Sequence, residues 1–156
     1  MVTPGEVYLF DKDGDFTVRF KPSNELKNPE GIATYTDKNK NVYVYVADTQ
    51  NNRIVKFRYA SNDTSTGLKF IDAVGSGGDG DKNFNRPTGM TADECGNLFI
   101  ADRNNARIQV FDKDLKFIDN FKQSFNNPTD VALGPDDDVL YVVDLGNNRI
   151  VKFDLS

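Results

Sequence analysis

Three aspartates in this sequence are each followed, five residues later, by an arginine, and such pairs could do acid–base or ion-binding chemistry. The pairs are Asp48 with Arg53, Asp102 with Arg107, and Asp144 with Arg149. A carboxylate beside a guanidinium can be a catalytic acid facing a cation, or a charge-assisted structural pair. Triplication favours the structural interpretation, because a catalytic site seldom needs three equivalent copies. We therefore expect each aspartate to accept hydrogen bonds from turn amides, and each arginine to bridge back across the turn.

An asparagine lies in the middle of each of these turns. The three residues are Asn51, Asn105 and Asn147. Asparagine tolerates the left-handed backbone conformation that tight turns need. We expect a structural role for them as well.

Other catalytic or metal-binding patterns are weak. Asp11-Lys12-Asp13-Gly14-Asp15 begins like an EF-hand calcium loop, but Phe16 stands where that loop needs glycine and Pro22 where it needs glutamate. The chain has no histidine, and Cys95 is its single cysteine. A zinc site or an activated nucleophile would therefore lack its usual ligands or base. We expect no metal, no cofactor and no enzymatic activity.

Composition points to one globular domain over residues 1–156. The chain is 38% hydrophobic, and its net charge of −5 disfavours a protein whose main task is to hold nucleic-acid phosphate. A lone cysteine cannot form an internal disulfide. Residues 1–6 show neither a basic region nor an apolar run, and no apolar segment approaches membrane-spanning length, so we expect a soluble domain without a signal peptide or membrane contact.

The Asp–Arg turns belong to a unit that recurs three times. In each copy a proline and a short apolar segment precede an apolar strand that ends at the aspartate, and a second apolar strand follows the arginine; the prolines are Pro29, Pro87 and Pro128. A fixed recurring unit predicts a repeat architecture. We predict strands a to d in residues 29–74, a second set in 87–121, and a third set in 128–156 that lacks strand d. Residues 6–20 supply strands c and d of a partial unit, which gives thirteen strands and no helix.

The unit resembles the NHL repeat, whose pattern runs Pro-x-Gly-Ile-Ala, then Gly-Asn-apolar-Ala-Asp, then x-x-Asn-x-Arg-apolar. Pro29-Glu30-Gly31-Ile32-Ala33 and residues 96–102 carry this pattern most fully. The resemblance implies an all-β fold of four-stranded antiparallel propeller blades, here about three blades plus a partial one. Such propellers usually have six blades, which a second chain or further sequence would complete, and they mostly bind proteins or, in some families, RNA.

The resemblance implies that the loops between strands b and c share one face with the loops between d and a. We expect a protein or peptide to bind there, to a non-catalytic scaffold. The candidate contact residues are Thr49, Gln50, Arg53, Arg103, Asn104, Arg107, Leu145, Gly146 and Arg149.

Two alternatives stay open. RNA could bind an arginine-lined face that also includes Arg86, although the acidic total charge disfavours this. A calcium-dependent propeller hydrolase is the second alternative, which the absence of histidine disfavours.

The predicted strand count also raises the question of assembly. Three blades cannot close a ring, and open end blades expose apolar faces and strand edges. Two copies joined head to tail, with residues 15–20 of one chain serving as the missing strand d beside residues 149–153 of the other, would form a homodimer. Blades from another polypeptide would cover the same edges.

Overall fold

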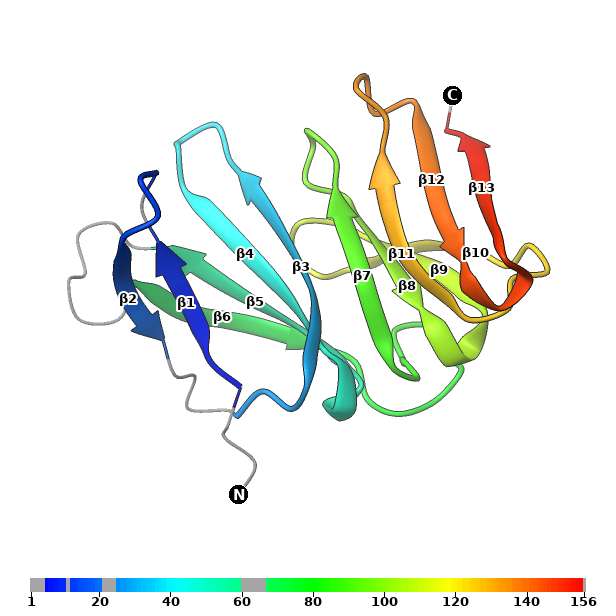
Figure 1. Cartoon of the computed structure of the whole chain (residues 1–156), viewed down its shortest axis with the longest axis horizontal. Coiled ribbons are helices and arrows are strands. Elements are labelled where there is room, and N and C mark those ends of the chain that lie inside the picture. Colours follow the sequence, from blue (N-terminus) through cyan, green and yellow to red (C-terminus); the bar gives the residue numbers. More distant parts are fainter. Residues whose placement is uncertain (1–4, 11, 21–24, 60–66, 156) are drawn as a thin grey trace.

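The computed structural model describes residues 5–10, 12–20, 25–59 and 67–155, and in these it contains thirteen β-strands. The strands form four antiparallel sheets: a two-stranded hairpin, two four-stranded sheets and one three-stranded sheet. Figure 1 shows the hairpin at one end of the molecule and the three-stranded sheet at the other. Among the described residues, no helix is long and apolar enough to cross a membrane.

The hairpin consists of β1 (Val7–Phe10) and β2 (Phe16–Phe20), which pair with each other. Blade 1 consists of β3 (Pro29–Thr36), β4 (Val42–Asp48), β5 (Arg53–Tyr59) and β6 (Leu68–Val74). Blade 2 consists of β7 (Pro87–Ala92), β8 (Leu98–Asp102), β9 (Arg107–Phe111) and β10 (Phe117–Phe121). Blade 3 consists of β11 (Pro128–Leu133), β12 (Val139–Asp144) and β13 (Arg149–Asp154).

This architecture confirms the predicted fold class: four-stranded antiparallel blades in series, with one partial blade before them and a last blade of three strands. The prediction that no helix is present is wrong. Each Asp–Arg turn forms a single turn of 3-10 helix: η1 (Thr49–Asn51), η2 (Arg103–Asn105) and η3 (Leu145–Asn147). Such short turns carry no apolar periodicity, so a search for amphipathic helices misses them.

Adjacent blades pack face to face through three apolar clusters. One joins blade 1 to blade 2 and contains Tyr45, Ile54 and Phe111. A second joins blade 2 to blade 3, and a third joins the hairpin to the outer face of blade 1. Each cluster removes apolar side chains from water on both sides of a contact, which is the main stabilising contribution in such a fold.

The position of a blade in the series decides the burial of its strands. β8 and β9 of blade 2 are buried at every residue, because blades 1 and 3 cover both faces. β12 of blade 3 alternates between buried and more exposed residues instead. Its exposed face includes Tyr141, and the neighbouring β13 adds Ile150.

Candidate functional site

The Asp–Arg turn of blade 2 is organised around a fully buried carboxylate. Asp102 Oδ1 accepts a hydrogen bond from the backbone N–H of Asn85 at 2.8 Å. Its Oδ2 accepts from Asn105 Nδ2 at 2.8 Å and from Arg107 Nε at 2.7 Å. The aspartate at the end of β8 therefore ties the loop that enters β7 to the turn that leaves β8.

The same arrangement recurs in the other two repeats. Asp48 accepts from the backbone N–H of Lys27 at 2.6 Å, and Asp144 accepts from that of Asn126 at 2.7 Å. The arginine five residues later donates to Oδ2 at 2.7 Å in both cases. The expected bridge across the turn is thus present in each copy.

The environment of Asp144 lowers the pKa of its carboxyl group. Burial of the carboxyl favours the neutral acid and raises its pKa. The hydrogen bonds from the Asn126 backbone, the Asn147 amide and Arg149 favour the carboxylate and outweigh burial, so the pKa of Asp144 lies below its usual value.

The arginine of blade 2 also holds a loop in place. Arg107 donates through its two terminal nitrogens to the carbonyl oxygens of Asp79, Gly80 and Asn83 at 2.8–2.9 Å. Gln109 Nε2 donates to the same Asn83 carbonyl at 2.7 Å. The long glycine-rich segment between β6 and β7 is therefore fixed by buried donors.

The contacts of the mid-turn asparagines agree with a structural role. The expectation that these residues adopt the left-handed backbone conformation is wrong. The left-handed residue of each turn is the next one: Asn52, Ala106 and Asn148, with φ of 50° to 53°. The side chains of Asn51, Asn105 and Asn147 instead donate to the aspartate and to a loop carbonyl. The side-chain amide matters here, because it supplies two donors.

Two candidate contact residues are inaccessible. Thr49 is fully buried, and its hydroxyl donates to the Pro87 carbonyl at 2.7 Å. Arg107 is 1% exposed and fully engaged with Asp102 and the loop. Neither side chain can contact a partner on the turn face, so the prediction is wrong at these positions.

The remaining candidates lie at the surface. Gln50, Asn104, Leu145, Gly146 and Arg149 are exposed, while Arg53 and Arg103 are partly buried. Asn104 is held by Asn85, since its Nδ2 donates to Asn85 Oδ1 at 3.0 Å. We call the exposed positions Gln50, Asn104 and Leu145, one on each 3-10 turn, the turn face.

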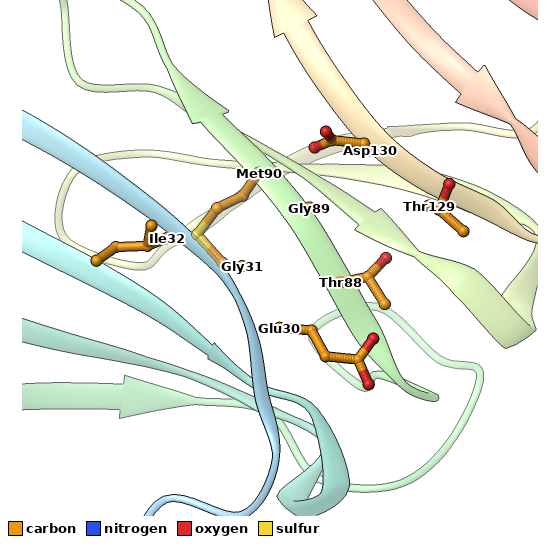
Figure 2. A pocket seen from close by; sticks show the side chains of 8 residues that line it. All are labelled: Glu30, Gly31, Ile32, Thr88, Gly89, Met90, Thr129 and Asp130. Carbon is orange, nitrogen blue, oxygen red and sulfur yellow. The ribbon is translucent and has the colours of Figure 1, made fainter. Parts of the chain in front are cut away.

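A pocket opens where the inner strands of the three blades meet, beside the turn face. It has a volume of about 260 Å³. Its lining comes from β3, β7 and β11 (Figure 2): Glu30, Gly31, Ile32, Thr88, Gly89, Met90, Thr129 and Asp130. These residues lie near the starts of the inner strands, at the end of each blade where Pro29, Pro87 and Pro128 pair with the turn aspartates.

Three of the residues that line this pocket, Glu30, Thr88 and Asp130, carry polar side chains with different surroundings. Glu30 is paired with Arg86 at 3.0 Å. Asp130 is exposed, and its Oδ1 accepts from the Val131 backbone at 3.0 Å. Thr88 is buried, and its hydroxyl is the one buried side-chain polar atom of the described residues without a hydrogen-bond partner. The pocket therefore offers carboxylates to a polar ligand, while the Thr88 hydroxyl is buried behind its surface.

Sequence reasoning missed this pocket. Its signal was a departure from the repeat: Asp130 stands where the other copies have Gly31 and Gly89. A Cβ at Gly89 would collide with Asp130, so the glycine leaves room for the carboxylate of the next blade.

The acidic loop considered for calcium lies in the turn between β1 and β2, and its first residue, Asp11, falls outside the described residues. Elsewhere in the described part of the chain, no three His, Cys, Asp or Glu side chains gather into a metal-binding group.

The sequence resembles known families over most of its length. Residues 1–155 match the SMP-30/gluconolactonase/LRE-like region. NHL repeat-containing protein 3 of Homo sapiens is 30% identical over 131 residues, which are 81% of this chain and 36% of that protein. Protein lin-41 of Caenorhabditis elegans is 46% identical over 48 residues, 31% of this chain and 4% of that protein. This chain thus spans about a third of the first relative.

Solved structures share the fold. A luciferin-regenerating enzyme superposes with a TM-score of 0.65 at 21% identity, over 92% of this chain and 45% of the other. A gluconolactonase from Xanthomonas campestris gives 0.65 at 20% identity, over 90% and 42%. At this identity the likeness concerns the fold, and fold alone does not assign a reaction.

The family match overturns one expectation. The description of the matched region names an enzyme class, gluconolactonase, and this contradicts the prediction that the chain is not an enzyme. That prediction, which rested on the absence of histidine, is wrong. Histidine is only one of several side chains that can serve as an acid or base. By the match over residues 1–155, this chain belongs to the SMP-30/gluconolactonase/LRE-like family of β-propellers and carries NHL-type repeats.

Proposed function

We propose that this chain recognises a protein or peptide on its turn face, with the adjacent pocket as the hollow of the binding surface. The observation that carries the proposal is the contrast within each turn. The aspartate, asparagine and arginine are consumed by internal hydrogen bonds in every copy, whereas the exposed side chains of the turns differ. Gln50 and Asn104 occupy the second position of their turns, and the third turn instead exposes Leu145 at its first position, followed by Gly146. A rigid framework that presents different side chains from three similar turns suits specific recognition at low entropic cost.

The chemistry of the surface favours a polypeptide over RNA. Of the five arginines considered for RNA, Arg107 is buried, and Arg53, Arg86 and Arg149 are paired with Asp48, Glu30 and Asp144. Leu145 is 51% exposed and gives the turn face an apolar contact beside amides. Mixed apolar and amide character is common in protein interfaces.

Selection from a displayed library of random peptides on the immobilised chain tests this proposal. We expect enriched peptides to bind the wild type and to lose about tenfold or more in affinity for a Gln50→Ala/Asn104→Ala/Leu145→Ala variant. A Lys38→Ala/Asn39→Ala variant, altered in the turn between β3 and β4, is the matched control. Failure to enrich any peptide, or equal loss in both variants, would contradict the proposal. Binding of polyuridine that falls steeply with salt would point to RNA instead.

A second candidate function is ester hydrolysis in the pocket, favoured by the exposed carboxylate of Asp130 in its lining. A carboxylate can accept a proton from water as the water attacks a lactone carbonyl, and return that proton to the ring oxygen as the C–O bond breaks, which releases the hydroxy acid. Gluconolactone hydrolysis, measured with and without added calcium, tests it. We expect Asp130→Asn to lower the rate and Asp136→Asn, in an exposed turn, to leave it unchanged. A wild type without activity in either condition would exclude it.

A further inference from the structure

The exposed face of the hairpin carries the same aromatic pair as a buried face of blade 2. Phe10 and Phe16 flank a turn that begins Asp-Lys-Asp, as Phe111 and Phe117 do. The rings of the first pair are 6.0 Å apart and inclined at 76°, and those of the second are 5.7 Å apart and inclined at 80°. Phe111 is fully buried against blade 1, whereas Phe10 is 59% exposed. The face of the hairpin that corresponds to the buried, blade 1-facing side of blade 2 is therefore exposed in this structure.

The exposed face of blade 3 resembles the face of blade 1 that packs on blade 2. Tyr45 lies opposite Lys56 in blade 1, and Tyr141 lies opposite Lys152 in blade 3. Tyr45 is fully buried under blade 2, whereas Tyr141 is 43% exposed. Ile54 and Ile150 differ in the same way, since the first is buried and the second exposed.

Within the molecule, the Asp-Lys-Asp turn of blade 2 sits on this Tyr–Lys pair. Lys56 Nζ lies 3.0 Å from Asp114 Oδ1 and 4.6 Å above the ring of Tyr43. The hydroxyl of Tyr45 donates to the Lys113 carbonyl at 2.8 Å. The contact therefore combines a charge pair, a hydrogen bond and aromatic burial.

The Tyr–Lys pair is not a general feature of the repeat. Blade 2 has Phe99 opposite Val110 at these positions, and blade 3 covers them. Tyr141 and Lys152 thus occur on the exposed face of blade 3, while the turn that fits them recurs in the hairpin.

We propose that a second copy of this chain docks its β1–β2 hairpin on the exposed face of blade 3. Asp13 of one copy then pairs with Lys152 of the other, as Asp114 does with Lys56. The Tyr141 hydroxyl donates to the Lys12 carbonyl, and Phe10 and Phe16 cover Tyr141 and Ile150. This contact is head to tail, so the copies join through unlike surfaces.

The hairpin docks as a unit and donates no strand. β2 is paired with β1, and Phe20 packs on Phe57 of the same copy at 5.3 Å between ring centroids. This differs from the exchange of residues 15–20 expected from the sequence, because β2 already has a partner.

Local ion pairs do not prevent the contact. Lys12 lies 2.8 Å from Asp13, and Lys152 lies 3.1 Å from Asp154. Asp114 likewise lies 2.7 Å from Lys113 while it holds Lys56. Lys12 Nζ donates to both oxygens of Asp13 at 2.8 Å, but each carboxylate oxygen has two lone pairs and can accept a second hydrogen bond from Lys152.

Light scattering across a concentration series tests the proposal on the purified chain. We expect the wild type to self-associate, and Lys152→Glu and Asp13→Lys each to weaken association by about tenfold or more through like-charge contact. Mixing the two variants restores association, because the carboxylate introduced by Lys152→Glu in one copy faces the ammonium group introduced by Asp13→Lys in the other. Combining both substitutions in one chain restores it as well.

Lys69→Glu is the matched control, since Lys69 is exposed on β6, the outer strand of blade 1. We expect it to associate like the wild type, and circular dichroism of every variant to match the wild type. A wild type that stays monomeric overturns the proposal, as does an association that charge reversal leaves unchanged. A mixture of the variants that fails to associate would also overturn it.

Discussion

Arg107 Nε donates to Asp102 Oδ2 over 2.7 Å, and the two side chains are among the most deeply buried in the molecule. Asp102 is fully buried and Arg107 is 1% exposed. A buried ion pair is tolerated only when the remaining donors and acceptors are also satisfied. In this pair they are satisfied, because the aspartate also accepts from Asn85 and Asn105, and the arginine also donates to three loop carbonyls.

Replacing Asp102 by Ala should therefore destabilise the fold strongly. The substitution leaves the buried Arg107 guanidinium without its carboxylate, which costs about 3–5 kcal/mol. Chemical denaturation would measure this loss. Asp144→Ala is the comparison: its arginine partner is half exposed, water can solvate the freed guanidinium, and the loss should be smaller. Equal losses in the two variants would contradict the assignment of the difference to burial.

The depressed pKa of Asp144 makes stability depend on pH in the acid range. Its carboxylate is favoured in the folded state, so below the ordinary value of 3.8 the unfolded chain binds more protons than the folded chain. The stabilisation is complete above about pH 4 and is lost as the pH falls through the lower folded pKa. We expect the Tm difference between wild type and Asp144→Asn to narrow as the pH falls below about 4. A Tm difference that stays constant as the pH falls, until acid unfolds the wild type, would contradict this.

The sequence predicted the strands well because each repeat marks its own boundaries. The aspartate ends strand b and the arginine begins strand c, as β4 ends at Asp48 and β5 begins at Arg53. The four strands predicted in residues 29–74 are β3 to β6, which begin at Pro29 and end at Val74. These boundaries depend on local hydrogen bonds, which the local sequence determines.

The accessibility of the motif residues could not be predicted in the same way. Arg107 and Arg149 occupy the same place in the repeat, yet one is buried and the other exposed. The difference arises from the segment before β7, whose carbonyls cover Arg107, and from the covered position of blade 2. The pocket escaped prediction for a related reason, because it forms only where three inner strands from distant parts of the chain converge.

Close approach of the inner strands should make one glycine intolerant of substitution. A Cβ at Gly31 would collide with the backbone carbonyl of Thr88 in the neighbouring β7, and a backbone group cannot rotate away. We expect Gly31→Ala to destabilise the fold by about 1–3 kcal/mol through overpacking. In the control Gly134→Ala, the nearest atom would be Val139 Cβ at 3.4 Å, so a change within about 0.5 kcal/mol is expected. Thermal melts of both variants would check this, and equal effects would contradict it.

The ion pair between Lys56 and Asp114 should contribute to the contact between blades 1 and 2. Lys56 is buried at the interface with its ammonium group above Tyr43, whereas about half of the Asp114 side chain is exposed to water. Hydrogen bonds from Lys113 and then Lys56 hold the pKa of Asp114 below its usual value, which indicates that both ammonium groups favour the carboxylate. Solvent screens such a half-exposed pair, so Asp114→Asn should cost about 1 kcal/mol.

A double-mutant cycle separates this pair from other effects of the substitution. Lys56→Met keeps much of the packing of the lysine stem but removes its charge. In that background, Asp114→Asn should cost clearly less than in the wild type, because the carboxylate no longer has a buried ammonium group to pair with. Denaturant unfolding of the four chains gives the coupling directly. A coupling of zero would mean that Lys113, and not Lys56, accounts for the stabilisation of the Asp114 carboxylate, and that packing alone holds the two blades together at this point.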